Sequence, residues 1–146
     1  MKACALFAVI ILLLSACSGP RARLVGGRIP DVLDERPEAS AYFEAVGIGA
    51  SDPALPTETQ RRALARDAAI VQAQYELLSM IKGVELDGGY KISRAIEVDS
   101  TLETKVNAAV RGAEVLKSEF TSDGGCVVTL RLPKRRLGAE TGLALR

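Results

Sequence analysis

The apolar residues of this chain recur at helical spacing in two segments, of which residues 57–83 form the longer. Its predicted buried stripe consists of Leu64, Ala68, Val71, Tyr75 and Leu78, widened by Ile70, Leu77 and Ile81. Thr57 and Gln60 form a capping box at its start, and Gly83 follows Lys82 at its end. The first half of the stripe is rich in alanine, so we expect that half to approach a sheet closely.

A second, shorter amphipathic helix is predicted before Gly112. Ser100 and Glu103 have the spacing of a capping box at its start. Its apolar face consists of Leu102, Val106, Ala109 and Val110.

Strand spacing, with apolar residues at every second position, predicts the remaining elements. We expect strands over residues 42–50, 84–86, 90–98, 116–120 and 126–132. In the first of these, the face shared by Tyr42, Val46 and Ile48 is predicted to be buried, although Glu44 interrupts it.

The last two strands read as a hairpin whose register follows from matching apolar faces. A three-residue loop at 123–125 places apolar residues opposite one another and leaves charged residues on a solvated face. The expected apolar pairs are Phe120 with Val128 and Leu116 with Leu132, and the expected polar pairs are Glu119 with Thr129 and Lys117 with Arg131.

These elements predict an α+β fold, with two amphipathic helices packed on one face of a small, mostly antiparallel sheet of three to four strands. We expect a single domain over residues 40–137, because the chain is too short for more than one. Residues 138–146 are expected to form a tail, and the chain from Lys134 onward is expected to be exposed.

The N-terminus has the pattern of a bacterial lipoprotein signal. Lys2 precedes an apolar run over residues 5–14, and Leu14-Ser15-Ala16-Cys17 follows as a lipobox. The run is about half the roughly 20 residues that a membrane-spanning helix needs. We therefore expect residues 1–16 to be a signal peptide and Cys17 to carry the lipid anchor, palmitate being one possible acyl chain. Ser18, rather than Asp, at the next position favours the outer membrane.

Residues 17–39 are predicted to be the anchor and its tether, because they contain three prolines and no sustained periodicity. Arginines in the first half of this segment could contact anionic head groups, but solvated linker charge is the favoured interpretation.

The amino-acid composition argues against several classes of site. The chain has no histidine, which removes His-based catalysis and His metal sites. Once Cys4 leaves with the signal and Cys17 is lipidated, Cys126 is the last cysteine, and its alternation with Val128 predicts burial. The mature charge is balanced and tryptophan is absent, so nothing indicates nucleic-acid binding. We expect no cofactor, no metal and no catalytic residues.

A partner surface is the remaining candidate site. Four basic residues are the candidates, namely Arg62 and Arg66 on the first helix and Lys117 and Arg131 on the hairpin. Ordinary solvated charge is the competing interpretation for them.

Several short motifs occur together in a recognisable order: Gly47-Ile48-Gly49, then Ala65-Arg66-Asp67-Ala68-Ala69 with Ala73 and Leu77, then Gly83-Val84, then Gly112-Ala113 before Asp123-Gly124. In this order the chain resembles a family of small outer-membrane lipoproteins over residues 41–133, and the same module resembles the N-terminal domain of flagellar assembly protein T. The resemblance implies two helices on a small sheet, a possible flagellar link and no catalytic residues. Flagellar assembly protein T continues into further domains, so a role at a flagellar ring is not expected of this chain alone.

Taken together, the patterns predict a non-catalytic outer-membrane lipoprotein that faces the periplasm and acts as an interaction or assembly module for an envelope protein. A lipoprotein that contacts peptidoglycan is the alternative, and a periplasmic hydrolase is a weaker one.

Overall fold

The computed structural model describes residues 23–30, 41–86 and 88–145. Their elements are, in chain order, β1 (Tyr42–Gly49), α2 (Glu58–Gly83), α3 (Ile92–Val98), α4 (Ser100–Arg111), β2 (Glu114–Phe120), β3 (Cys126–Pro133) and α5 (Lys134–Thr141). The three strands form an antiparallel sheet in the order β1-β3-β2. Helices pack against this sheet, so the predicted α+β class is confirmed, with four helices in the described residues where two were expected.

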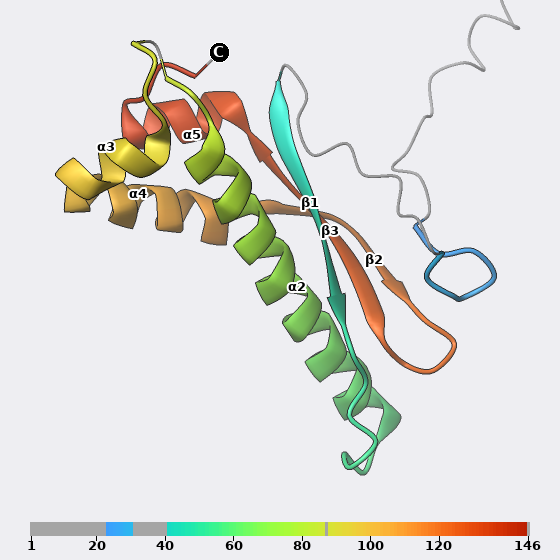
Figure 1. Cartoon of the computed structure of the whole chain (residues 1–146). Coiled ribbons are helices and arrows are strands. Elements are labelled where there is room, and N and C mark those ends of the chain that lie inside the picture. Colours follow the sequence, from blue (N-terminus) through green and yellow to red (C-terminus); the bar gives the residue numbers. More distant parts are fainter. Residues whose placement is uncertain (1–22, 31–40, 87, 146) are drawn as a thin grey trace, which may run out of the picture.

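The long helix α2 runs along one face of the sheet, while α3, α4 and α5 gather at the end of the sheet where α2 finishes (Figure 1). The predicted capping box at the start of α2 is confirmed. The Gln60 amide donates to the Thr57 hydroxyl, and the Gln60 side chain reaches back to the Thr57 amide.

The close contact between α2 and β1 depends on small residues from both elements. Ala65, Ala69 and Ala73 of α2 are fully buried. A Cβ added to Gly49 would lie 1.8 Å from the Ala65 carbonyl oxygen, and one added to Gly47 would lie 2.0 Å from that of Ala69. The predicted close approach of the alanine-rich half is therefore confirmed, and the two glycines permit it by lacking side chains.

The buried faces of β1 and α2 are nevertheless out of phase with the sequence predictions. On β1 the residues that face α2 are Phe43, Ala45, Gly47 and Gly49, the set opposite to the one expected. On α2 the buried residues are Ala65, Ala69, Ala73, Leu77 and Ile81. Leu64, Val71 and Tyr75, expected in the core, are exposed. Leu77 and Ile81 are buried as predicted, and Val46 is buried on the outer face of the sheet. Elsewhere the alanines and glycines, rather than the bulkier residues, form the inner face.

The chain between α2 and α4 also differs from the prediction. The expected strand 84–86 is reduced to one bridge between Glu85 and Lys91. The expected strand 90–98 is the helix α3 instead. Ile92 and Ile96 have helical as well as alternating spacing, and the helix buries Ile92 fully while Ile96 packs against the core.

Helix α4 buries the predicted face, but its cap differs. Leu102, Val106, Ala109 and Val110 are all buried, and Gly112 caps the C-terminal end as expected. Asp99, rather than Ser100, is the N-cap. Its carboxylate accepts hydrogen bonds from the Thr101 amide and hydroxyl, which lower the pKa of Asp99.

The predicted hairpin between β2 and β3 forms with a different register. Phe120 pairs with Cys126, so the loop is residues 121–125 rather than 123–125. The other expected pairs are wrong for the same reason, and Leu116 sits at a register shift. Because both loops have an odd length, residues 117–120 keep their predicted faces, whereas the shift at Leu116 places Val115 opposite Leu130.

The segment after β3 is not an exposed tail. It forms α5, in which Leu137 is fully buried and Lys134 and Thr141 are also buried. Leu143 and Leu145 pack against the core beyond the helix end. Helix α5 crosses residue 137, where the domain was expected to end.

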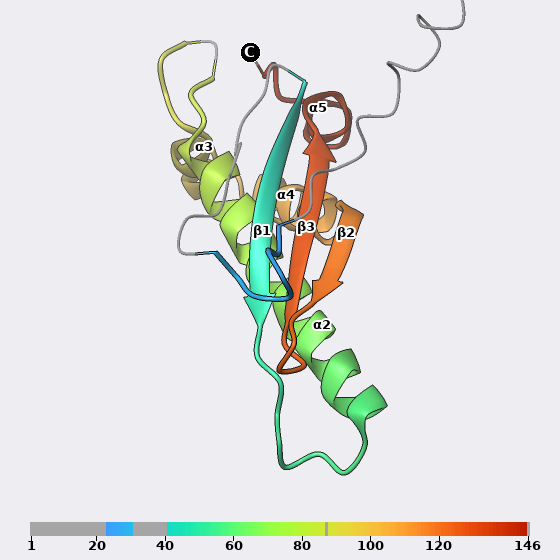
Figure 2. The same ribbon diagram turned by 90° about the vertical axis from the view of Figure 1, so that its right-hand side faces the viewer.

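Residues 23–30, which the sequence assigned to the tether, lie across β1 and β3 on the face of the sheet opposite α2 (Figures 1 and 2). A tight turn at Gly26 and Gly27 joins the bridged residues Val25 and Arg28. The Ser122 amide donates a hydrogen bond to the Gly27 carbonyl oxygen at 2.8 Å. The outer face of the sheet is therefore partly covered, and Val127 and Thr129 on it are buried.

Candidate functional site

The four basic residues predicted to meet a partner lie on two separate surfaces. The first pair, Arg62 and Arg66, is exposed on α2. The Arg62 guanidinium lies 5.3 Å from the centre of the Phe120 ring and 2.7 Å from the Glu58 carboxylate. The contact with Phe120 joins the start of α2 to the edge strand β2.

The second pair, Lys117 and Arg131, lies on the outer face of the sheet and is engaged within the chain. Arg131 binds Glu44 at 3.0 Å, and its guanidinium lies 4.0 Å from the centre of the Tyr42 ring. Lys117 lies 3.4 Å from Glu119. The outer face was predicted to be solvated, but both residues are only partly exposed.

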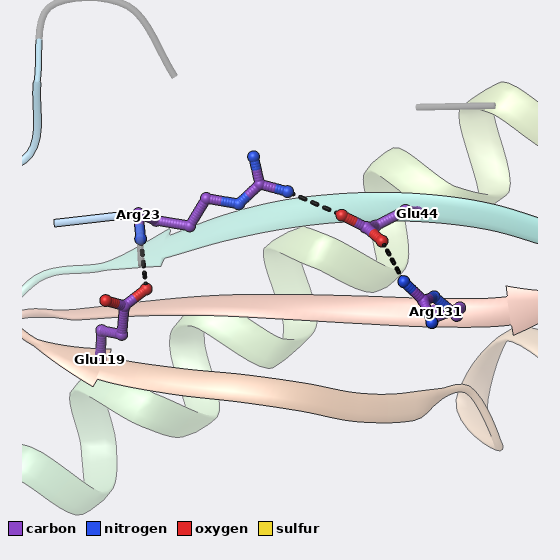
Figure 3. Close-up of polar contacts among 4 residues, drawn as sticks. All are labelled: Arg23, Glu44, Glu119 and Arg131. Carbon is purple, nitrogen blue, oxygen red and sulfur yellow. Dashed lines mark hydrogen bonds and ion pairs between the residues drawn. The ribbon is translucent and has the colours of Figure 1, made fainter. Parts of the chain in front are cut away.

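Arg23 connects these two carboxylates, as Figure 3 shows. Its side chain binds Glu44 at 2.7 Å, and its backbone amide donates to Glu119 at 2.7 Å. The side chains of Arg23 and Glu44 are only 10% and 11% exposed, so Arg23 is not a solvated linker charge. Each carboxylate in this cluster is matched by basic groups, which makes the cluster a clamp that holds residues 23–30 on the sheet.

A groove of about 880 Å³ opens where β1 ends and the β2–β3 loop begins. Two of its three charged lining residues, Arg61 and Asp123, have partners within the chain. Arg61 donates to the Leu55 carbonyl oxygen at 2.7 Å. The Thr121 hydroxyl donates to Asp123 and lowers the pKa of that carboxyl group. Among the described residues, no group of three or more side chains is arranged to hold a metal ion.

Cys126 borders this groove, but its side chain is fully buried, as its alternation with Val128 predicted. Burial raises the pKa of the Cys126 thiol, which keeps it protonated and a poor nucleophile at neutral pH. The finding favours packing over reactivity for this residue.

The largest feature that the sequence patterns misassigned is the outward face of α2. Leu64, Val71 and Tyr75 are 47%, 64% and 70% exposed, and Ala68 between them is exposed as well. We call these four residues the α2 stripe. Their helical spacing is the usual signal for a core face. The signal that could have separated the two faces is the alanine series Ala65, Ala69 and Ala73, which matches the two glycines of β1.

The predicted lipidation site, Cys17, lies outside the described residues. Within the ranges that the structure describes, none of the helices has the length and apolar character needed to cross a membrane.

Comparisons of this chain with models of protein families, with curated proteins and with solved structures find no match.

Proposed function

We propose that this protein is a lipid-anchored, non-catalytic module of the bacterial outer membrane that presents the α2 stripe to a partner in the envelope. The exposed stripe carries the proposal. Apolar side chains left in water forgo about 25 cal/mol of stabilisation for each Å² that could be buried. An apolar patch with polar residues around it is typical of an interaction surface. Asp67 and Lys82 are such polar residues, because they lie on the same side of α2 as the stripe.

The clamp on the outer face limits how far the folded domain can lie from its proposed anchor. Six peptide steps separate Cys17 from Arg23, so an anchor on Cys17 would lie within about 20 Å of Arg23. Arg23 is held on the face of the sheet opposite α2. The clamp would then keep the sheet near the anchor, and the α2 stripe, on the other side of the sheet, would stay free to meet a partner in the periplasm.

The resemblance to small outer-membrane lipoproteins and to the N-terminal domain of flagellar assembly protein T supports the same class of function. It adds a possible flagellar context, with the envelope partner as the component to be identified.

Lipidation of Cys17 is expected to place the protein in the outer membrane. Cells fed a clickable fatty acid should label the wild type and Cys4→Ser, and they should not label Cys17→Ser. Cys4 is the matched control because it lies within the predicted signal peptide. Equal labelling of Cys17→Ser and wild type would contradict the anchor.

Partner contact is expected at the α2 stripe. A photo-reactive amino acid at Val71 should crosslink in cells, whereas the same group at Glu76, also exposed but on another side of α2, should not. Turnover of a cell-wall or ester substrate by the purified protein, lost on changing one polar residue, would overturn the non-catalytic proposal.

A further inference from the structure

The spacing within the α2 stripe is that of a seam between two helices. Leu64, Ala68, Val71 and Tyr75 follow one another at intervals of four, three and four residues. This alternation keeps side chains on one line of a helix and is the pattern by which paired helices interlock. With a rise of 1.5 Å per residue, the stripe is about 17 Å long.

The stripe is also symmetric about its own midpoint, which lies between residues 69 and 70. An antiparallel pairing of two α2 helices about that point sets Leu64 against the second copy's Tyr75. The same pairing sets Ala68 against the second copy's Val71, so that a small residue faces a larger one. A two-fold interface uses the same patch on both subunits and therefore needs this self-complementarity. We propose that the α2 stripe binds a second copy of this chain, with the two α2 helices antiparallel.

The charges along α2 suit this arrangement. Glu58 lies in the first turn of α2 and Lys82 in the last turn. Antiparallel pairing brings Glu58 level with the end of the second copy's α2, near its Lys82, and this contact occurs twice. Lys82 is 38% exposed and is only loosely paired within the chain, at 4.0 Å from Glu103. Beside the stripe, Asp67 faces the second copy's neutral Gln74, so no like charges meet there.

The area buried at the seam determines the expected affinity of the dimer. Three large side chains over three helical turns fall short of the roughly 800 Å² per partner of a standard stable interface. We therefore expect a weak dimer that depends on concentration. Attachment of both copies to one membrane would raise their effective concentration and favour it. This dimer deepens the proposed function and rests on it, because it names a second copy of the chain as the partner of the α2 stripe.

The test uses the full chain in cells, with two differently tagged copies and a photo-reactive amino acid at Tyr75. We expect a crosslinked product that contains both tags and is attached at the peptide around Leu64 of the second copy. Val71→Asp should reduce this product at least tenfold, since the pairing buries the new charge. Ala63→Asp adds the same charge at an exposed position off the stripe and should leave the product unchanged.

Thermal unfolding of purified Val71→Asp should match that of the wild type, which separates loss of pairing from loss of folding. A product without both tags, or attachment at Tyr75 of the second copy, would overturn the antiparallel dimer. Crosslinking from the stripe to a different envelope protein would overturn the dimer and leave the proposed function standing. Absence of any crosslinked product would overturn both.

Discussion

Gly49→Ala is expected to destabilise this protein by at least about 3 kcal/mol, the upper end of the effects of overpacking. The added methyl group would lie 1.8 Å from the Ala65 carbonyl oxygen and 2.8 Å from the Ala69 backbone nitrogen. Both neighbours are backbone atoms of α2, so the whole helix has to move before the methyl group fits. Because small domains have total stabilities of roughly 5–15 kcal/mol, this loss is a large part of what holds the fold together.

The measurement is urea unfolding of the purified variant against wild type, with Gly83→Ala as the matched control. Gly83 ends α2, and nothing lies within 4 Å of a Cβ built there. Its replacement should change the free energy of unfolding by less than about 1 kcal/mol. If Gly49→Ala were as stable as Gly83→Ala, the close packing of β1 on α2 would be wrong.

Gly47 and Gly49 show which part of the packing could not be predicted from the sequence. The apolar spacing placed Tyr42, Val46 and Ile48 on the inner face of β1 and gave Gly47 and Gly49 no role in packing. Neither glycine has a positive φ, and both are required because α2 lies where a side chain would be. Absence of a side chain leaves no periodic signal, so the inner face of β1 could not be identified from apolar spacing alone.

Where a signal is local, the sequence predictions succeed. The Thr57–Gln60 capping box gave the start of α2, and the spacing of Leu102 and Val106 gave the inner face of α4. Residues 117–120 of the hairpin were placed on the correct faces but two residues out of register, because loops of three and five residues satisfy the same alternation. The five-residue loop closes through the Thr121 amide, which donates to the Gly125 carbonyl oxygen at 2.9 Å.

The clamp and the α2 stripe depend on long-range structure instead. Arg23 and Glu119 are 96 positions apart, and a single arginine in a segment without periodicity has no pattern that indicates its partner. The stripe was visible as a pattern, but its exposure depends on which side of α2 the glycines of β1 accept. A helix with two apolar faces leaves that choice to tertiary packing.

Truncating one side chain on each apolar face of α2 should show which face packs in the core. The two losses of unfolding free energy are expected to differ widely. Leu77 is fully buried in the core, and Leu77→Ala is expected to cost about 2–5 kcal/mol of unfolding free energy. Val71 is 64% exposed, and Val71→Ala should cost no more than about 0.5 kcal/mol. Both substitutions introduce alanine, which favours helix, so propensity does not account for the difference.

Urea unfolding at low protein concentration is the appropriate measurement, because a weak dimer through the stripe would be dissociated there. At low concentration, the free energy of unfolding of Val71→Ala should then be close to that of the wild type. The effect of this substitution on dimerisation should appear only at high protein concentration or on a membrane. Had the bulky stripe been the core face, the order of the two variants would be reversed. A larger cost for Val71→Ala than for Leu77→Ala would therefore contradict the packing of α2 on the sheet and, with it, the surface on which the proposed function depends.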